Sequence, residues 1–186
     1  MNAVFSLSID PVLTSILCAT LSVILLIGAG QKLRDLELFR AVVENYRLAP
    51  ESLEGLVAIG LPILEVIAGL TILFDSSRTF GAALALLLLG LVTGAVIINL
   101  VRGRRKINCG CGGPDGRQTL SWGLVLRNAI LVIGVSFGAV DGRARDLFWV
   151  DYLTVGFGTV ALFGLYMLVN QLLANHPRLM GLRTSI

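Results

Sequence analysis

Five long apolar runs constrain the fold of this chain more than any other feature of its sequence. A helix needs roughly 20 apolar residues to cross a bilayer, and each run reaches that length. Hydrophobic residues make up 55% of the chain and charged residues only 15%, which excludes an ordinary soluble domain. We therefore predict an all-α membrane protein, a bundle of about five transmembrane helices in which residues 1–186 form a single integral membrane domain. The predicted spans are approximately 11–31, 53–74, 79–101, 120–140 and 152–173.

Two local patterns refine this bundle. Between the first two runs, apolar positions from Leu36 to Tyr46 alternate with charged ones at helical spacing. This pattern predicts a short amphipathic helix that lies along the membrane interface with its apolar face in the lipid and ends at Pro50. In the third run, Gly90 and Gly94 form a Gly-x-x-x-Gly motif, a spacing that lets helices approach closely in lipid.

The distribution of positive charge predicts the orientation. Five crossings place the 75–78 and 141–151 turns beside the N-terminus, and the 32–52 segment, the 102–119 loop and the C-terminal tail on the opposite side. The first side carries three Lys and Arg residues and the second carries eleven; Arg127 lies inside a run and completes the total of 15. Because Lys and Arg are enriched in cytoplasmic loops, we expect a periplasmic N-terminus and a cytoplasmic 102–119 loop. These charges follow the ends of the runs, so the predicted partner is the lipid bilayer and not nucleic acid.

The 102–119 loop carries two cysteines separated by one glycine, Cys109-Gly110-Cys111. A disulfide between residues so close in sequence requires the chain to bend, which Gly110 permits, and Gly112 and Gly113 extend this predicted hinge. Strained, exposed disulfides tend to be catalytic or regulatory. We therefore predict that Cys109 and Cys111 are the catalytic residues. The alternative is that both are small buried residues in a tight turn.

The remaining cysteine and histidine do not add a metal site. Cys18 lies inside the first apolar run, where cysteine behaves as a small buried hydrophobe. His176 is the only histidine. Two cysteines and one histidine lack the fourth ligand of a closed zinc site, so no metal is predicted. If the protein is an enzyme, the cysteine pair indicates a thiol–disulfide oxidoreductase.

Four polar side chains fall inside the runs or at their ends, on the side of the cysteine loop. Ionisable residues within membrane spans mark functional sites by default. Glu65 lies ~18 Å and Arg127 ~10 Å from that surface, at the rise of an α-helix. With Lys32 and Asn99, they predict a polar pocket under the two thiols, in which Lys32 or Arg127 favours the thiolate. The alternative is a structural ion pair between Glu65 and Arg127.

Several of these motifs together resemble the family of the methylamine utilisation protein MauE, which is similar to the DoxX-like membrane proteins. The resemblance covers about 15–173, and its most specific part is the block from the cysteines to Arg127-Asn128. The matching motifs are Lys32-Leu33, Phe39…Tyr46…Pro50, Leu61-Pro62-x-x-Glu65, Asn108-Cys109-Gly110-Cys111-Gly112, Leu120-Ser121-Trp122 and Arg127-Asn128.

The resemblance implies a multi-pass protein of the cell inner membrane that serves the processing and maturation of the methylamine dehydrogenase beta subunit. It implies disulfide exchange at Cys109 and Cys111, beside a thioredoxin-like partner, MauD. Because this client is periplasmic and charge places the thiols in the cytoplasm, we expect electrons to be relayed across the bilayer. Two alternatives stay open. One is a DoxX-type oxidoreductase subunit with a quinone as its cofactor, and the other is a non-catalytic assembly or transport factor.

Overall fold

The computed structural model describes residues 10–105, 107–110, 118–139 and 148–183, and within them the fold is helical. No strand occurs in these ranges, where a single antiparallel bridge pairs Asn108 with Thr119. The all-α fold class predicted from the apolar runs is thereby confirmed. The helices are α1 (Pro11–Arg34), α2 (Leu36–Tyr46), α3 (Glu51–Thr71), α4 (Arg78–Val101), α5 (Trp122–Gly138) and α6 (Trp149–Arg183).

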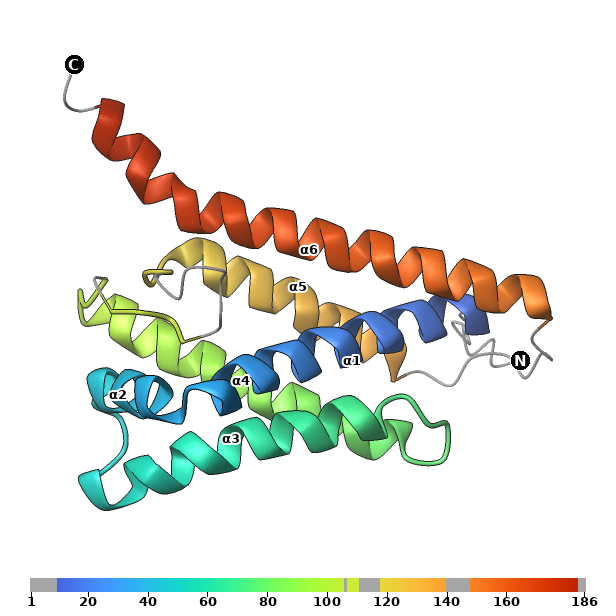
Figure 1. Cartoon of the computed structure of the whole chain (residues 1–186), viewed down its shortest axis with the longest axis horizontal. Helices are drawn as coiled ribbons and strands as arrows, with labels where there is room; N and C mark the ends of the chain where they lie inside the picture. Colours follow the sequence, from blue (N-terminus) through green and yellow to red (C-terminus); the bar gives the residue numbers. More distant parts are fainter. Residues whose placement is uncertain (1–9, 106, 111–117, 140–147, 184–186) are drawn as a thin grey trace, which may run out of the picture.

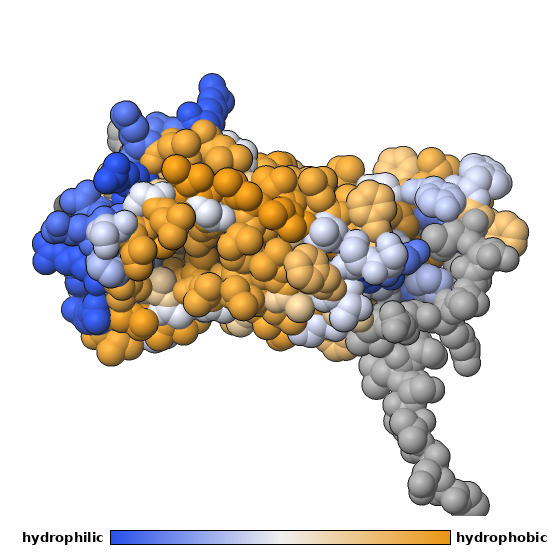
Figure 2. All heavy atoms as spheres, turned by 90° about the horizontal axis from the view of Figure 1, so that it is seen from below, coloured by the Kyte–Doolittle hydropathy of each residue, from blue (hydrophilic) through white to orange (hydrophobic). Residues whose placement is uncertain are grey.

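The long helices lie side by side and form a membrane-sized bundle (Figure 1). Helix α1 contacts α3, α5 and α6, and α4 packs between α3 and α5. Four helices, α1, α3, α4 and α6, are long and apolar enough to cross a membrane. Helix α5 has 17 residues, at the lower end of the range for a crossing helix. Apolar side chains cover the middle of the face seen in Figure 2, as expected for a protein embedded in lipid.

The chain turns between α1 and α2 at a single capping residue. Lys32 and Arg34 lie in the last turn of α1, where positive charge is favourable. Asp35 follows and accepts a hydrogen bond from the backbone N–H of Leu38, at 3.0 Å, which caps the start of α2. Helix α2 ends at Tyr46, because Arg47 adopts a left-handed conformation with φ 49°. The predicted end at Pro50 was therefore wrong, and Pro50 instead precedes α3.

The apolar face of α2 packs against the protein itself. Phe39, Val42 and Tyr46 are buried in a cluster with residues of α3, α4, α5 and the cysteine segment, including Cys109. Leu38, on the other face, is 54% exposed. The sequence predicted that the apolar face enters the lipid, and this is corrected. Burying this face against residues of α3, α4 and α5 removes its apolar surface from both water and lipid.

The close approach between α3 and α4 also differs from the prediction. It occurs at Gly81, where a Cβ atom would lie 2.5 Å from the backbone nitrogen of Ile72. Gly90 and Gly94 have no atom within 4 Å of such a Cβ and instead line a pocket. The Gly-x-x-x-Gly motif therefore creates space inside the described chain, and it does not bring two of its helices together.

The two ends of the bundle differ in composition. Helix α2 and the segments around Cys109 and Leu120 lie at one end, and the 75–77 turn lies at the other (Figure 1). Hydrophilic residues cover the end at which α2 lies (Figure 2). The charge count likewise placed the 32–52 segment and the 102–119 loop on one side of the membrane and the 75–78 turn on the other. Which end faces the cytoplasm stays a prediction.

Candidate functional site

Cys109 is held in a short antiparallel arrangement between α4 and α5. Its backbone N–H donates to the carbonyl of Gln118 at 2.7 Å, and the N–H of Leu120 donates to the carbonyl of Ile107 at 3.1 Å. The residue is 5% exposed. This burial is what the alternative interpretation, a small residue in a tight turn, expects for Cys109. Any reactivity of this thiol therefore depends on what reaches it through the protein.

Helix α2 fixes the turn that carries Cys109. The hydroxyl of Tyr46 donates to the carbonyl of Cys109 at 3.1 Å. Gly110 has a backbone φ of +71°, which residues with a side chain rarely adopt. A Cβ atom on it would lie 2.7 Å from Cγ1 of Val42. Glycine is thus required at this hinge position for both reasons. Cys111, Gly112 and Gly113 lie outside the described residues.

Tyr46 also connects Asn99 to the cysteine turn. Its backbone carbonyl accepts hydrogen bonds from the side chains of Asn99, at 3.3 Å, and Arg104, at 3.4 Å. Arg104 also donates to the amide oxygen of Asn99 at 3.1 Å, and Asn99 is fully buried. Asn99 therefore contacts the end of α2, and the Tyr46 side chain at that end contacts the cysteine turn.

Replacing Tyr46 with phenylalanine is expected to loosen this turn. A lost hydrogen bond costs about 0.5–1.5 kcal/mol, so local opening at Cys109 should become roughly 2- to 12-fold more frequent. The rate at which a lipid-soluble maleimide labels Cys109, in a background of Cys18→Ser and Cys111→Ser, measures that opening. Tyr152→Phe is the matched control, because Tyr152 is 64% exposed on α6. Equal labelling rates for both variants would contradict the anchoring role.

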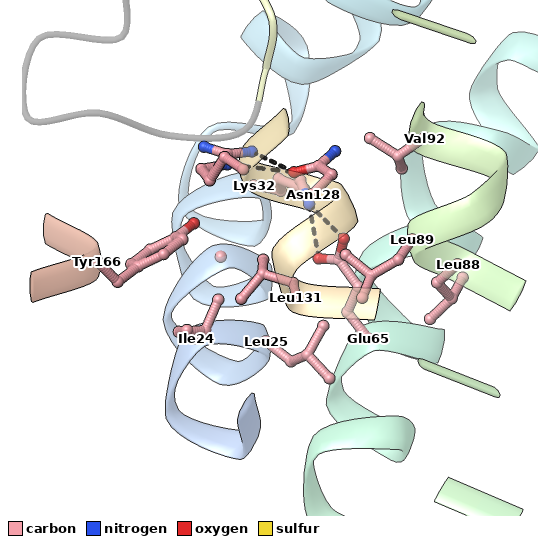
Figure 3. A pocket seen from close by; sticks show the side chains of 12 residues that line it. Ile24, Leu25, Lys32, Glu65, Leu88, Leu89, Val92, Asn128, Leu131 and Tyr166 are labelled. Atoms are coloured by element: carbon pink, nitrogen blue, oxygen red, sulfur yellow. Dashed lines mark hydrogen bonds and ion pairs between the residues drawn. The ribbon is translucent and has the colours of Figure 1, made fainter. Parts of the chain in front are cut away.

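A buried ion pair lies deeper in the bundle. The ammonium of Lys32 on α1 donates to both carboxylate oxygens of Glu65 on α3, at 2.5 and 2.7 Å (Figure 3). Both residues are buried, and the ammonium also lies 5.6 Å from the ring centroid of Phe39. The sequence proposed Arg127 as the partner of Glu65, and the structure places Lys32 in that role. In an apolar environment, each charge makes burial of the other tolerable.

Arg127 joins α5 to α6 and α4 through side-chain amides. It donates to Asn170 at 2.6 Å and to Asn128 at 2.8 and 3.1 Å, and it lies 5.6 Å from the ring of Tyr166. Asn128 in turn donates to the hydroxyl of Thr93 at 3.0 Å. A guanidinium has five donors, so this set of acceptors makes its burial possible. The interactions link three helices within the apolar part of the bundle.

Two cavities that share lining residues lie beside these groups and the cysteine turn. The smaller, about 60 Å³, is lined by Lys32, Glu65 and Arg127 and has room for a few water molecules. The larger, about 570 Å³, is mainly apolar and includes Lys32, Tyr46 and Cys109 in its wall. Lys32 and Val92 line both cavities. The remaining residues around the larger one are Phe39, Val42, Val43, Leu48, Ala49, Val57, Leu61, Gly90, Leu91, Gly94, Ala95, Ile98 and Gly110.

The comparison with known families assigns this chain to a family. The model of the family described as methylamine utilisation protein MauE matches residues 10–141, which include α1 to α5 and the cysteine segment. This chain belongs to the MauE family. No solved structure is significantly similar to it.

Three MauE relatives illustrate how far the similarity extends. The methylamine utilization protein MauE of Paracoccus versutus is 31% identical over 90% of this chain and 92% of its own length. The protein of the same name from Methylorubrum extorquens is 39% identical over 73% of this chain and 72% of its own length. That of Paracoccus denitrificans is 35% identical over 66% of each chain.

In this MauE family member, the structure brings together some of the predicted site residues. Lys32, Glu65 and Arg127 surround one cavity, Cys109 lies on the next, and Asn99 lines neither. Within the described residues no cluster of three metal-binding side chains occurs. Whether Lys32 or Arg127 tunes the thiolate stays a prediction.

Sequence reasoning missed several polar residues of this candidate site. Asn170 and Thr93 lie inside apolar runs, where a search for ionisable groups alone passes over them. A neutral amide within a membrane span also needs a partner, because lipid offers none. The position of the Asn170 amide within an apolar run could therefore have identified this residue from the sequence. The role of Tyr46 was hidden, since its ring fitted the apolar face of α2.

Proposed function

We propose that the protein serves methylamine utilisation as a thiol–disulfide redox protein of the membrane, with Cys109 and Cys111 as the pair that cycles between dithiol and disulfide. One observation carries this proposal: Cys109 lies in a turn fixed by α2 at the wall of a large pocket. Lys32 lines the same pocket. A nearby positive charge favours the thiolate, which is the form that attacks a disulfide.

The client in this proposal is the beta subunit of methylamine dehydrogenase, whose disulfides the protein would help to form during processing. A thioredoxin-like protein, MauD, is the proposed partner in the exchange. Membership of the family supports the link to methylamine utilisation, and the resemblance of the cysteine block supports this client and this partner. We place the protein in the inner membrane. The charge count puts the end of the bundle that carries Cys109 on the cytoplasmic face, so the proposal includes electron transfer across the bilayer to the periplasmic client.

Replacing both Cys109 and Cys111 with serine is the direct test. The expected result is that methylamine dehydrogenase activity falls to the background of a host that lacks the protein, because no disulfide can pass through the pair. Activity and the disulfide state of the beta subunit measure the effect, and an immunoblot of membranes checks that the variant is present. Cys18→Ser is the control, because Cys18 packs in a separate cluster with residues such as Leu21 and Ile72.

A non-catalytic assembly factor is the rival function. The packing of Cys109 within an apolar cluster of α2, α4 and α5 favours it, since a small residue suits that position regardless of its thiol. This rival expects the double serine variant to mature the beta subunit normally. Undiminished maturation would therefore refute the redox proposal and leave the cysteine turn as a docking or structural element.

A further inference from the structure

The short antiparallel ladder around the cysteine turn determines which side chain lies beside Cys109. Asn108 and Thr119 form its bridge, so Cys109 lies directly opposite Gln118 in the next pair. The hydrogen bond from the backbone N–H of Cys109 to the carbonyl of Gln118, at 2.7 Å, confirms this register. Side chains of directly opposite residues lie on the same face, with Cβ atoms about 4.5–5.5 Å apart. The thiol of Cys109 and the amide of Gln118 therefore share one face of the ladder.

This shared face is the inner one. Cys109 and Gln118 are each 5% exposed. Ile107 and Leu120, two residues further along the same face, pack in the apolar cluster that contains Cys109. The intervening bridge pair, whose side chains point to the other face, is only half-buried. Gln118 thus places a polar amide on the inner, mainly apolar face of the turn.

The amide of Gln118 makes no hydrogen bond within the part of the chain that the structure describes. Its nitrogen and its oxygen are both buried, and neither has a partner. A buried polar group without a partner destabilises a fold, and native proteins contain few of them. An apolar residue of similar length would therefore serve packing better at this position. The presence of an amide here points to a role in the chemistry of its neighbour.

A thiolate at Cys109 provides the acceptor that this amide needs. Burial in apolar surroundings disfavours the charged form of a thiol, and Cys109 lies in an apolar cluster. A nearby hydrogen-bond donor offsets that penalty, because a bond to a charged acceptor is stronger than one to a neutral acceptor. The amide of a glutamine lies at the end of a flexible chain, so rotation of the Gln118 side chain can bring an N–H group to the sulfur opposite it.

We infer that the amide N–H of Gln118 donates to the thiolate of Cys109 and stabilises it. The inference deepens the proposed function, and it rests on that function for the use to which the thiolate is put. In the ionisation the S–H bond of Cys109 breaks, the proton goes to water, and the electron pair stays on the sulfur. Tyr46 holds the backbone carbonyl of the same residue, so Tyr46 fixes the main chain and Gln118 acts on the sulfur.

The pH dependence of alkylation tests this inference. Full-length protein with Cys18→Ser and Cys111→Ser is placed in nanodiscs and labelled with a lipid-soluble iodoacetamide over a series of pH values. The midpoint of the rate profile reports the ionisation of Cys109, whereas the rate at the plateau reports access to the sulfur. We expect Gln118→Met to raise the midpoint by about one to two pH units, because it removes a hydrogen bond to a charged group. The temperature of unfolding should stay the same or rise, because methionine leaves no amide unpaired.

Thr119→Val is the matched control. Thr119 adjoins Gln118 in the chain, but its side chain lies on the other face of the ladder, so the midpoint should not change. Gln118 lines neither cavity, so its replacement leaves the wall of the pocket beside Cys109 intact. An unchanged midpoint in Gln118→Met would overturn the inference. If the plateau rate rises and the unfolding temperature falls without a shift in midpoint, Gln118 is a structural residue and the inference is equally wrong.

Maturation of the client separates this inference from the proposed function. If Gln118→Met shifts the midpoint but the variant with Cys109→Ser and Cys111→Ser matures the beta subunit normally, the effect of Gln118 on the thiolate stands and the proposed redox function is refuted. If the double serine variant loses maturation but Gln118→Met leaves the midpoint unchanged, the redox function stands and the role of Gln118 is refuted.

Discussion

Replacing Glu65 with glutamine is expected to destabilise the folded protein by about 3–5 kcal/mol, because it leaves a buried ammonium without its counter-charge. Lys32 donates to both oxygens of Glu65, and both side chains are buried between α1 and α3. Glutamine has the same shape but no charge. The midpoint of thermal unfolding in detergent, followed by circular dichroism, measures the loss. Glu51→Gln is the control on the same helix, since Glu51 is exposed.

A second variant separates the structural role of the Lys32–Glu65 ion pair from any functional role. Replacing both residues, with Lys32→Met and Glu65→Leu, should return the stability to near that of the wild type, because apolar residues of similar volume often replace a buried pair without loss. If Lys32 favours the thiolate, this stable variant should still fail to mature the beta subunit. Normal stability of Glu65→Gln alone would contradict the ion pair as described.

The second large effect is expected for Gly110→Ala. The positive φ of Gly110 costs an alanine about 1–2 kcal/mol, and the contact with Val42 at 2.7 Å adds roughly 1–3 kcal/mol of overpacking. We therefore expect a total loss of about 2–5 kcal/mol, concentrated at the cysteine turn. The rate at which a lipid-soluble maleimide labels Cys109 should rise accordingly, while the helices stay folded.

Gly103→Ala provides a close control for this variant. Gly103 has φ +76°, nearly the value of Gly110, but a Cβ atom there would meet no atom within 4 Å. Gly103→Ala should therefore lose only the stability that the positive φ costs, about 1–2 kcal/mol. Equal effects of the two substitutions would show that α2 does not press on the turn, and the described packing of Val42 on Gly110 would be wrong.

Length and apolarity determined the helices, because both are local properties of the chain. The lipid offers no hydrogen-bond partners, so any apolar run of about 20 residues must satisfy its own backbone and become a helix. The spacing of Cys109, Gly110 and Cys111 likewise identified the turn and its glycine. Membership of the MauE family was visible in the same motifs.

The partners of the polar residues were decided by tertiary structure. Depth along a helix can be counted from the sequence, and it placed Glu65 and Arg127 in the same leaflet. Which helices are neighbours, and which way each side chain points around its axis, cannot be counted in that way. Because α1 lies against α3, Glu65 meets Lys32, and Arg127 turns to Asn128 and Asn170. For the same reason the apolar face of α2 covers Cys109, and the large pocket beside this residue is mainly apolar, where the sequence predicted a polar one.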